Sequence, residues 1–243
     1  MRLVDCRECP LRQRKIFTPF TEEELTYMQR FKVGEMTLDA GRTFLQEGSS
    51  SPQLFTVLSG MGIRYKLLEN GARQVVNFLL PGDFAGLQAA IMGEMKHSAE
   101  ATTEVHLCVF DRAELWNLFR RHPLRAYDLT WLAAMEEHYL GEAVVSIGQR
   151  DARQRVAWSL LKLFQRLRAV GMGVRNIVPL PYRQQDLADA LGLSLVHTNK
   201  TLARLRSEGL ASWAEGKLRI DDPSRLATVA VMDLEAPEQR PLI

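Results

Sequence analysis

The stretch DLADALGLSLVHTNKTLARLRSEGL, residues 186–210, has the pattern of two short helices separated by one glycine. Leu187 and Leu191 are four residues apart and therefore share one helical face. Gly192 follows where a tight turn between helices requires a positive φ, which glycine adopts at no steric cost. Ser194 is placed to cap the second helix by accepting a backbone N–H bond. The pattern predicts a helix-turn-helix, two helices joined at a steep angle by a short turn.

The second helix has an apolar face and a polar face. Its apolar positions, at steps of three and four, are Leu195, Thr198, Leu202 and Leu205. If this helix enters a major groove, its first turns meet base edges. By residue type, Asn199 suits adenine, Lys200 suits guanine, and Val196 suits the thymine methyl group. Arg183 and Gln184 are better placed for phosphates, which set register and read no sequence. The predicted DNA-contacting residues are Arg183, Gln184, Ser194, Val196, His197, Asn199, Lys200 and Arg204.

The following stretch, residues 209–220, predicts two short strands, Leu210–Ala214 and Lys217–Ile220, around a Glu-Gly turn. A hairpin directly after the second helix is the wing of a winged helix-turn-helix. Residues 150–219 carry 13 Lys and Arg against 5 Asp and Glu, whereas the whole chain has a net charge of +2. This imbalance indicates a polyanion partner. The alternatives are a solvated basic face and an ordinary helical hairpin, but wing and charge together favour a DNA-binding domain over 150–243.

The part of the chain before Pro123 has the pattern of a β domain. A helix is expected from Thr21, which forms a capping box with Glu24. The stretch 84–93, FAGLQAAIMG, predicts a short inserted helix. We expect a β-sandwich or barrel over 21–122, after a polar segment 1–20 that holds two cysteines. The turn signals recur at intervals of roughly ten residues, as DAG (39–41), EGSSSP (47–52), SGMG (59–62), ENG (69–71) and PGD (81–83).

A long helix is predicted over 124–148, within a connecting segment 123–149. A second apolar set, Trp131, Met135 and Tyr139, is placed to cover the β domain. A helix with two apolar faces packs on its own domain and on a twin helix, which predicts a homodimer; the alternative is one helix buried against one core. The expected dimerisation residues follow the spacing of a coiled-coil seam, namely Leu129, Leu132, Glu136, Leu140, Ala143 and Ile147.

Length and composition restrict the class of protein. The 243 residues suit two domains. The sequence contains no run of 18 or more apolar residues, the length that a membrane-spanning helix needs. The first residues have no apolar segment of the signal-peptide type, and three cysteines cannot all pair, so we expect a cytoplasmic protein. No HExxH, GxSxG or P-loop motif occurs in a suitable context, which argues against an enzyme. The alternative is a ligand-binding barrel that regulates something other than DNA binding, but this alternative would leave the winged segment unexplained.

A β domain, a long helix and a winged helix-turn-helix in this order resemble the CRP/FNR family of bacterial transcription regulators. The most specific stretches are residues 58–87 and 187–210. The resemblance implies an α+β fold with an N-terminal cyclic-nucleotide-binding-type β jelly roll, a long dimerisation helix and a C-terminal winged helix-turn-helix. It also implies a homodimer on palindromic double-stranded DNA and contacts with RNA polymerase. Val196 and Lys200 stand where the family often has Glu and Arg, so its usual half-site is not transferred.

The resemblance places an effector pocket in the β domain. Nucleotide-binding members use a Glu for the ribose and an Arg for the cyclic phosphate, and the matching residues here are Leu87 and His97. A buried phosphate without a fixed cation is poorly compensated, and imidazole is mostly neutral at pH 7. The sequence therefore argues against cyclic AMP and leaves another small ligand open. The candidate pocket residues are Gly82, Gly86, Leu87, Gln88, His97 and Ser98.

Three cysteines match positions of the oxygen-sensing FNR branch, namely Cys6 and Cys9 in a CxxC motif and Cys108 in the β domain. The fourth matching position is Lys15, whereas iron–sulfur clusters and structural zinc sites usually take four ligands. We expect Cys108 to be a buried apolar residue, and keep as an alternative a redox- or oxygen-responsive regulator that uses all three. Haem or nitric oxide sensing stays undecided, and the cofactor is left open. The histidines considered for haem are His97, His106, His122 and His138.

Overall fold

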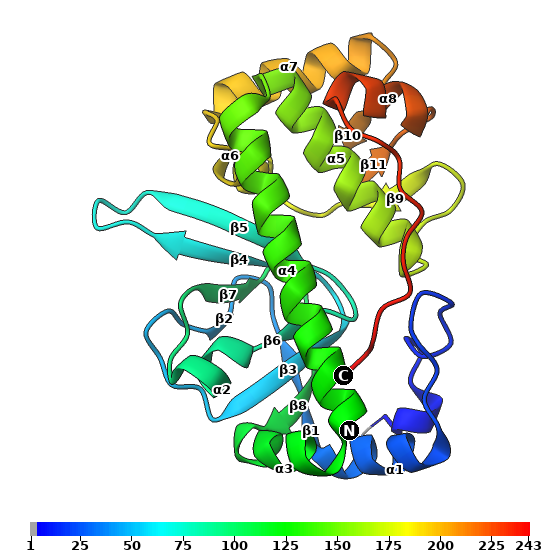
Figure 1. Cartoon of the computed structure of the whole chain (residues 1–243). Coiled ribbons are helices and arrows are strands. Elements are labelled where there is room, and N and C mark those ends of the chain that lie inside the picture. Colours follow the sequence, from blue (N-terminus) through cyan, green and yellow to red (C-terminus); the bar gives the residue numbers. More distant parts are fainter. Residues whose placement is uncertain (1–3) are drawn as a thin grey trace. The chain divides into compact units, whose positions relative to one another are not determined.

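The computed structural model describes residues 4–243, and the chain forms two compact units (Figure 1). Unit 1 consists of the described part of Met1–Lys66 together with Asn77–Glu137 and Gln239–Ile243. Unit 2 consists of Leu67–Val76 and His138–Glu238. The division assigns two short segments to a different unit from their neighbours in the sequence. A ten-residue hairpin tip belongs to unit 2, and the segment Gln239–Ile243 belongs to unit 1.

Unit 1 is built on two four-stranded sheets, with strand orders β1-β8-β3-β6 and β2-β7-β4-β5. Strand β3 pairs antiparallel with both β8 and β6, as expected of a jelly roll in which chain-distant strands are neighbours. The β5 strand continues from the hairpin tip into unit 1. The bounds are β1 Lys32–Leu38, β2 Thr43–Leu45, β3 Gln53–Ser59, β4 Gly62–Leu67, β5 Arg73–Leu79, β6 Phe84–Ala85, β7 Ser98–Ala101 and β8 Val105–Asp111.

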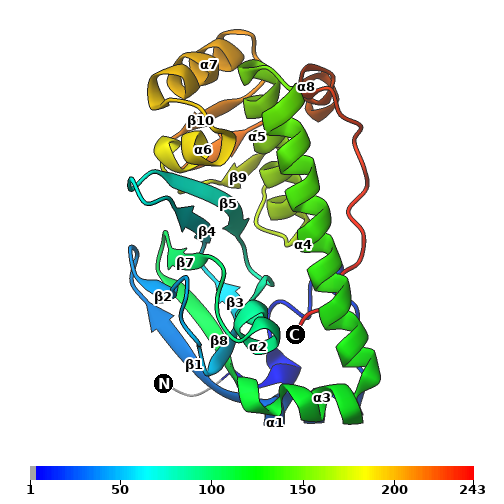
Figure 2. The same ribbon diagram turned by 60° about the vertical axis from the view of Figure 1, so that its left-hand side comes forward.

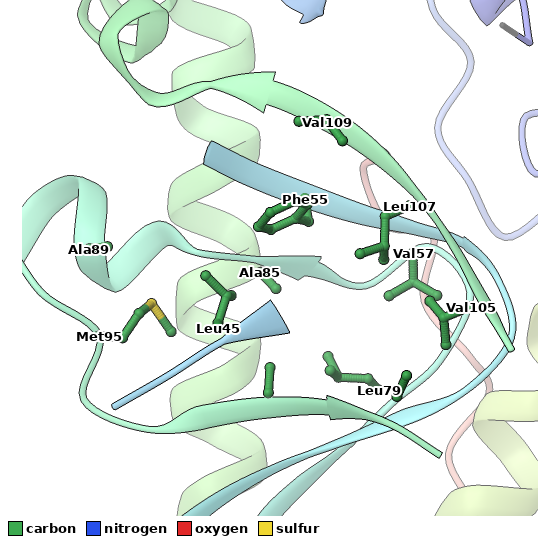
Figure 3. Close-up of a cluster of buried hydrophobic side chains, with 12 residues drawn as sticks. Leu45, Phe55, Val57, Leu79, Ala85, Ala89, Met95, Val105, Leu107 and Val109 are labelled. Carbon is green, nitrogen blue, oxygen red and sulfur yellow. The ribbon is translucent and has the colours of Figure 1, made fainter. Parts of the chain in front are cut away.

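The interior of unit 1 is filled by side chains that alternate along the strands (Figure 3). In β8, Val105, Leu107 and Val109 are buried, because successive side chains of a strand point to opposite faces. Gly60 is required at the β3–β4 turn, since its φ is +86° and a Cβ there would lie 2.1 Å from the carbonyl oxygen of Glu104.

The helices of unit 1 flank the sheets. Helix α1 begins as the sequence predicts: the Thr21 hydroxyl accepts from the Glu24 amide at 3.3 Å, and the Glu24 carboxylate accepts from the Thr21 amide at 2.8 Å. Phe31 of this helix stacks on Phe110 of β8, with 4.9 Å between ring centroids. The bounds are η1 Cys6–Glu8, α1 Glu22–Phe31, α2 Leu87–Met92, η2 Arg112–Glu114 and α3 Leu115–Arg121.

Unit 2 contains the winged helix-turn-helix that the sequence predicts (Figure 2). Its three-stranded sheet has the order β10-β11-β9. Strand β9 was not expected from the sequence, because the two nearby prolines predicted a loop there. Pro179 fits as the last residue of a three-residue edge strand, where no ladder N–H is needed. The bounds are α5 Ala152–Ala169, β9 Ile177–Pro179, α6 Gln184–Leu191, α7 Leu195–Ser207, β10 Ser212–Ala214, β11 Lys217–Arg219 and α8 Pro223–Ala230.

Helix α4, Pro123–Gln149, starts in unit 1 and continues into unit 2. Its expected dimer seam is divided between two roles. Leu129 is only 1 % exposed in a core cluster of unit 1, and Leu132 packs against the same cluster. Glu136 binds side chains of its own unit. Leu129 and Leu132 therefore pack on the chain's own core, and Glu136 is engaged within unit 1, whereas the dimer seam assigned from the sequence stays a prediction.

Several exposed apolar side chains of α4 lie after Glu136. Val144 is 69 % exposed, and Leu140, from the expected seam, is 37 % exposed. Ala143 and Ile147 are half-buried. None of the helices among residues 4–243 combines the length and apolar character needed to cross a membrane.

Candidate nucleic-acid interface and effector site

The turn between α6 and α7 has the geometry that its sequence predicts. Gly192 ends α6 in the left-handed region, with φ 64° and ψ 36°. Ser194 caps α7, and its hydroxyl accepts from the His197 amide at 3.2 Å. Leu187 and Leu191 are 1 % exposed, so they fix α6 to the core of unit 2. The turn therefore holds α7 at the surface with its N-terminal end capped.

Helix α7 buries one face and exposes the other. Thr198 and Leu205 are fully buried, and Thr201 joins them at 6 % exposure. Leu195, expected on this inner face, is 39 % exposed in the first turn, and Leu202 is half-buried. Thr198, which the sequence placed on this face, and Thr201, which it did not, thus carry much of the buried contact of the helix.

The outer face of α7 carries the side chains expected to meet bases. Val196 is 64 % exposed, and His197, Asn199 and Lys200 are exposed beside it. The first two turns of the helix thereby present the apolar side chain of Val196, the amide of Asn199 and the ammonium group of Lys200, which suit a thymine methyl group, adenine and guanine respectively. The arrangement suits readout of base edges from a groove.

Two of the predicted DNA-contacting arginines are held by carboxylates. Arg183 donates to Asp186 from Nε at 3.1 Å and from Nη2 at 2.8 Å, while its side chain stays 64 % exposed. Arg204 donates to Glu208 at 2.9 Å, and Glu208 also pairs with Arg153. These arginines are oriented by their partners. Gln184 is half-buried at the start of α6.

Asp186 lies in the first turn of α6 and is the acceptor for two arginines. It is fully buried and also accepts from Arg73, whose guanidinium contacts Asp189 at 2.8 Å. Burial by itself raises the pKa of Asp186, but hydrogen bonds from Arg183 and Arg73 outweigh it and hold the pKa below its ordinary value. The carboxylate is therefore charged at neutral pH and fixes α6. No local pattern in the sequence points to Arg73, which is 113 positions away from Asp186.

Most residues of the expected effector pocket support the local fold. Gly82 leaves room for Phe17, since a Cβ would lie 2.4 Å from that ring. Gly86, with φ 101°, caps α2, and Leu87 opens that helix. The side-chain Oε1 of Gln88 accepts from the Lys96 amide at 3.0 Å, and the Ser98 hydroxyl accepts from the Glu47 amide at 3.0 Å. These polar groups are occupied within the chain.

His97 lies beside a charged cluster that the sequence did not reveal. Burial and the nearby Arg64 lower the pKa of His97 to about 4, so the imidazole is neutral at pH 7. Arg64 pairs with Glu136 at 2.6 Å and donates to the Phe84 carbonyl at 2.6 Å. Asn77 donates to the same carboxylate at 2.9 Å. The site matched to a cyclic phosphate therefore holds a neutral histidine and an arginine already paired with a carboxylate.

The three cysteines lie around one small cavity of unit 1, of about 20 Å³, which is room for one water molecule. Cys6 and Cys9 are buried, and Cys108 is half-buried rather than fully buried as expected. Burial raises the pKa of Cys6, and raises that of Cys108 to about 12, so both are protonated thiols at neutral pH.

The cysteine cavity does not fit a metal centre. Among residues 4–243, no three His, Cys, Asp or Glu side chains lie close enough together to hold a metal ion. Lys15, at the position of a fourth thiolate, is exposed. The residues present therefore do not supply the ligand set of an iron–sulfur cluster.

Two known domain families match the chain. The cyclic nucleotide-binding domain family matches residues 35–122, and the Crp-like helix-turn-helix domain family matches residues 154–229. The first match covers most of the jelly roll, and the second contains the whole helix-turn-helix and its wing.

Relatives match along almost the entire chain. The nitrogen fixation regulation protein FixK of Bradyrhizobium diazoefficiens is 31% identical over 225 residues, which are 93% of each protein. The transcriptional activatory protein AadR of Rhodopseudomonas palustris is 29% identical over 184 residues, 76% of each. The solved structure of FixK2 from Bradyrhizobium japonicum has a TM-score of 0.74 at 25% identity, covering 83% of this chain and 98% of that one. These relatives are regulators and not enzymes, and the chain belongs to the CRP/FNR family of transcription regulators.

Proposed function

We propose that the protein works as a homodimer whose two α7 helices read the halves of a palindromic DNA site, with RNA polymerase as the further partner. The observation that carries the proposal is the outer face of α7, where Val196, His197, Asn199 and Lys200 are exposed beside a capped helix end. Amide, cationic and apolar groups exposed on one helix face match the hydrogen-bonding and methyl groups that base edges present in a major groove. The excess of basic residues in the same domain supports a polyanion partner.

The DNA-contacting residues divide into two roles in this proposal. Asn199 and Lys200 read bases, and Val196 contacts a thymine methyl group. Arg183 and Arg204 are oriented by carboxylates, which suits phosphate contacts that set the register of the helix. Ser194 acts by capping α7, and its exposed position allows a phosphate contact as well.

Dimerisation in this proposal uses the exposed apolar part of α4. Leu140 and Val144 are one helical turn apart, and both apolar side chains are exposed. Ala143 and Ile147 lie next to them and are half-buried. The half of the expected seam that follows Glu136 is therefore the part available to a second copy.

We further propose that DNA binding does not depend on cyclic AMP. The neutral His97 offers no cation to a phosphate, and Glu136 already neutralises Arg64. Leu87 supplies no carboxylate for a ribose. Titration calorimetry of the purified protein with cyclic AMP should show no binding heat. Saturable binding at micromolar concentration would contradict this part of the proposal.

The DNA proposal is tested by electrophoretic shift with genomic fragments. The wild type should retain specific fragments, and Asn199→Ala plus Lys200→Ala should lose the preference over competitor DNA. Two good base contacts are worth about 1–3 kcal/mol each, so the loss should exceed roughly tenfold. A control, Arg14→Ala plus Arg42→Ala, removes two exposed cations from unit 1 and should bind like the wild type. Equal retention by both double variants would reject the assigned face.

A further inference from the structure

The segment Gln239–Ile243 is docked into unit 1, although it follows the DNA-binding domain in the chain (Figure 2). Its last two side chains, Leu242 and Ile243, are 2 % and 3 % exposed. Ile243 belongs to the same apolar cluster as Cys6 and Met28. The burial shows that the segment completes a core.

Specific polar contacts fix the segment. The Arg240 amide donates to the Ile16 carbonyl at 2.8 Å, and the Arg240 carbonyl accepts from the Thr18 amide at 2.9 Å. The Arg240 guanidinium pairs with Asp83 at 3.0 Å, and the buried Thr56 hydroxyl donates to the Ile243 carbonyl at 2.6 Å. The docking is therefore directional, with a defined register.

The segment covers the thiols. Leu242 and Ile243 line the small cavity that Cys6, Cys9 and Cys108 also line. Thr56, which holds Ile243, stands directly opposite Cys108 in the β3–β8 ladder. Two aliphatic side chains of the segment thus form part of the wall around three free cysteines.

The guanidinium of Arg12 lies at the same cavity. The Nε and Nη1 atoms of Arg12 are buried and have no hydrogen-bond partner among residues 4–243. The guanidinium stacks on Phe20 at 3.9 Å from the ring centroid. A positive group beside thiols favours their ionised form once water is admitted, because it stabilises the thiolate.

The connection that leads to the segment allows it to leave. Residues 232–238 form no helix or strand, and 233–238 are exposed. The covering residues are few, so their release exposes less apolar surface than unfolding of unit 1. Such local opening costs less free energy than global unfolding.

We propose that Gln239–Ile243 is a removable cover of the cysteine cavity, and that its release controls the reaction of Cys6, Cys9 and Cys108 with small thiol-directed electrophiles. While the segment is docked, the thiols of Cys6 and Cys108 are protonated, and the segment forms part of the wall of the cavity that all three cysteines line. When it leaves, water enters, thiolate forms beside Arg12 and Lys32, and the sulfur becomes a nucleophile.

The test is alkylation by iodoacetamide under native conditions, with each cysteine followed by mass spectrometry. The thiolate sulfur forms a bond to the methylene carbon, iodide leaves, and the thiol proton goes to solvent. A chain ending at Glu238 should be alkylated at the three cysteines roughly tenfold faster or more than the full chain. Arg240→Ala should lie between the two, and the exposed control Arg42→Ala should match the wild type.

Hydrogen exchange separates release of the cover from unfolding. In the shortened chain, exchange should rise around 16–18 and 54–58, which contact the segment, and stay unchanged in β7 of the other sheet. Unchanged alkylation rates in the shortened chain would overturn the proposal. A uniform rise of exchange that includes β7 would also overturn it, because the thiols would then be exposed by unfolding.

Discussion

His97 and Glu136 show how single side chains in unit 1 depend on contacts far away in the chain. Nothing adjacent to His97 marks it as neutral, and its environment is set by Arg64 together with Glu136, Lys66 and Glu47. In contrast, Thr21 and Ser194 cap their helices through amides three residues away, and their roles were predictable from sequence. Residue roles set by near neighbours are readable in sequence, whereas roles set by folding need the structure.

The neutral state of His97 predicts a pH dependence of stability. The unfolded chain protonates His97 as the pH falls through about 6.5, whereas the folded chain does so only near pH 4. The free energy of unfolding therefore falls between these values, by about 2 kcal/mol from pH 7 to pH 5. Urea unfolding at both pH values should show a smaller loss for His97→Gln. Equal losses in both proteins would contradict a buried neutral imidazole.

The Arg64–Glu136 pair predicts non-additive substitutions. Glu136→Gln leaves the buried Arg64 uncompensated and should cost about 1–3 kcal/mol, less than a fully buried pair because Glu136 is 29% exposed. Arg64→Met alone should also destabilise. The double variant should be more stable than the sum of both losses, which a double-mutant cycle of unfolding free energies measures. Additive losses would mean that the pair contributes no coupling.

At the scale of elements, the helix-turn-helix is the part that sequence predicts best. Gly192 and Ser194 carry local signals, and the wing follows from the Glu215-Gly216 turn, where both residues have positive φ. Strand β9 was missed because three residues next to prolines have no pattern of their own. The sequence pattern assigned Leu129 of α4 to dimerisation, whereas in the structure Leu129 packs in the core of unit 1. Spacing alone does not say whether an apolar helix face meets its own domain or a second copy.

The exposed part of α4 predicts the effect of a charged substitution on assembly. Leu140→Asp plus Val144→Asp places two carboxylates on side chains that are 37% and 69% exposed, so the fold of the subunit should be unaffected. Burying these charges in a dimer is unfavourable, and the dissociation constant should rise at least about a hundredfold. Analytical ultracentrifugation measures the mass. Trp116→Asp, an exposed apolar position on α3, is the control and should stay dimeric. A dimeric Leu140/Val144 variant would place the interface elsewhere.

At the scale of the whole molecule, helix α4 and the chain that leads to Gln239–Ile243 are two of the connections between the units, which the hairpin tip Leu67–Val76 joins as well. The first was predictable from a long apolar periodicity. The second was not, because five residues carry too little pattern to indicate a docking site 187 positions away at Thr56. The gathering of Cys6 and Cys9 with Cys108 at one cavity likewise joins residues that are far apart in the sequence.

The central claim is that α7 reads bases from both copies of a dimer, and selection of binding sites from random DNA tests it most directly. The wild type should select an inverted repeat with half-sites about one helical turn apart. Lys200→Ala should select the same repeat with one base pair of each half-site no longer specified, because only that contact is removed. An identical, fully specified motif from both proteins, or a motif without a repeat, would contradict the account.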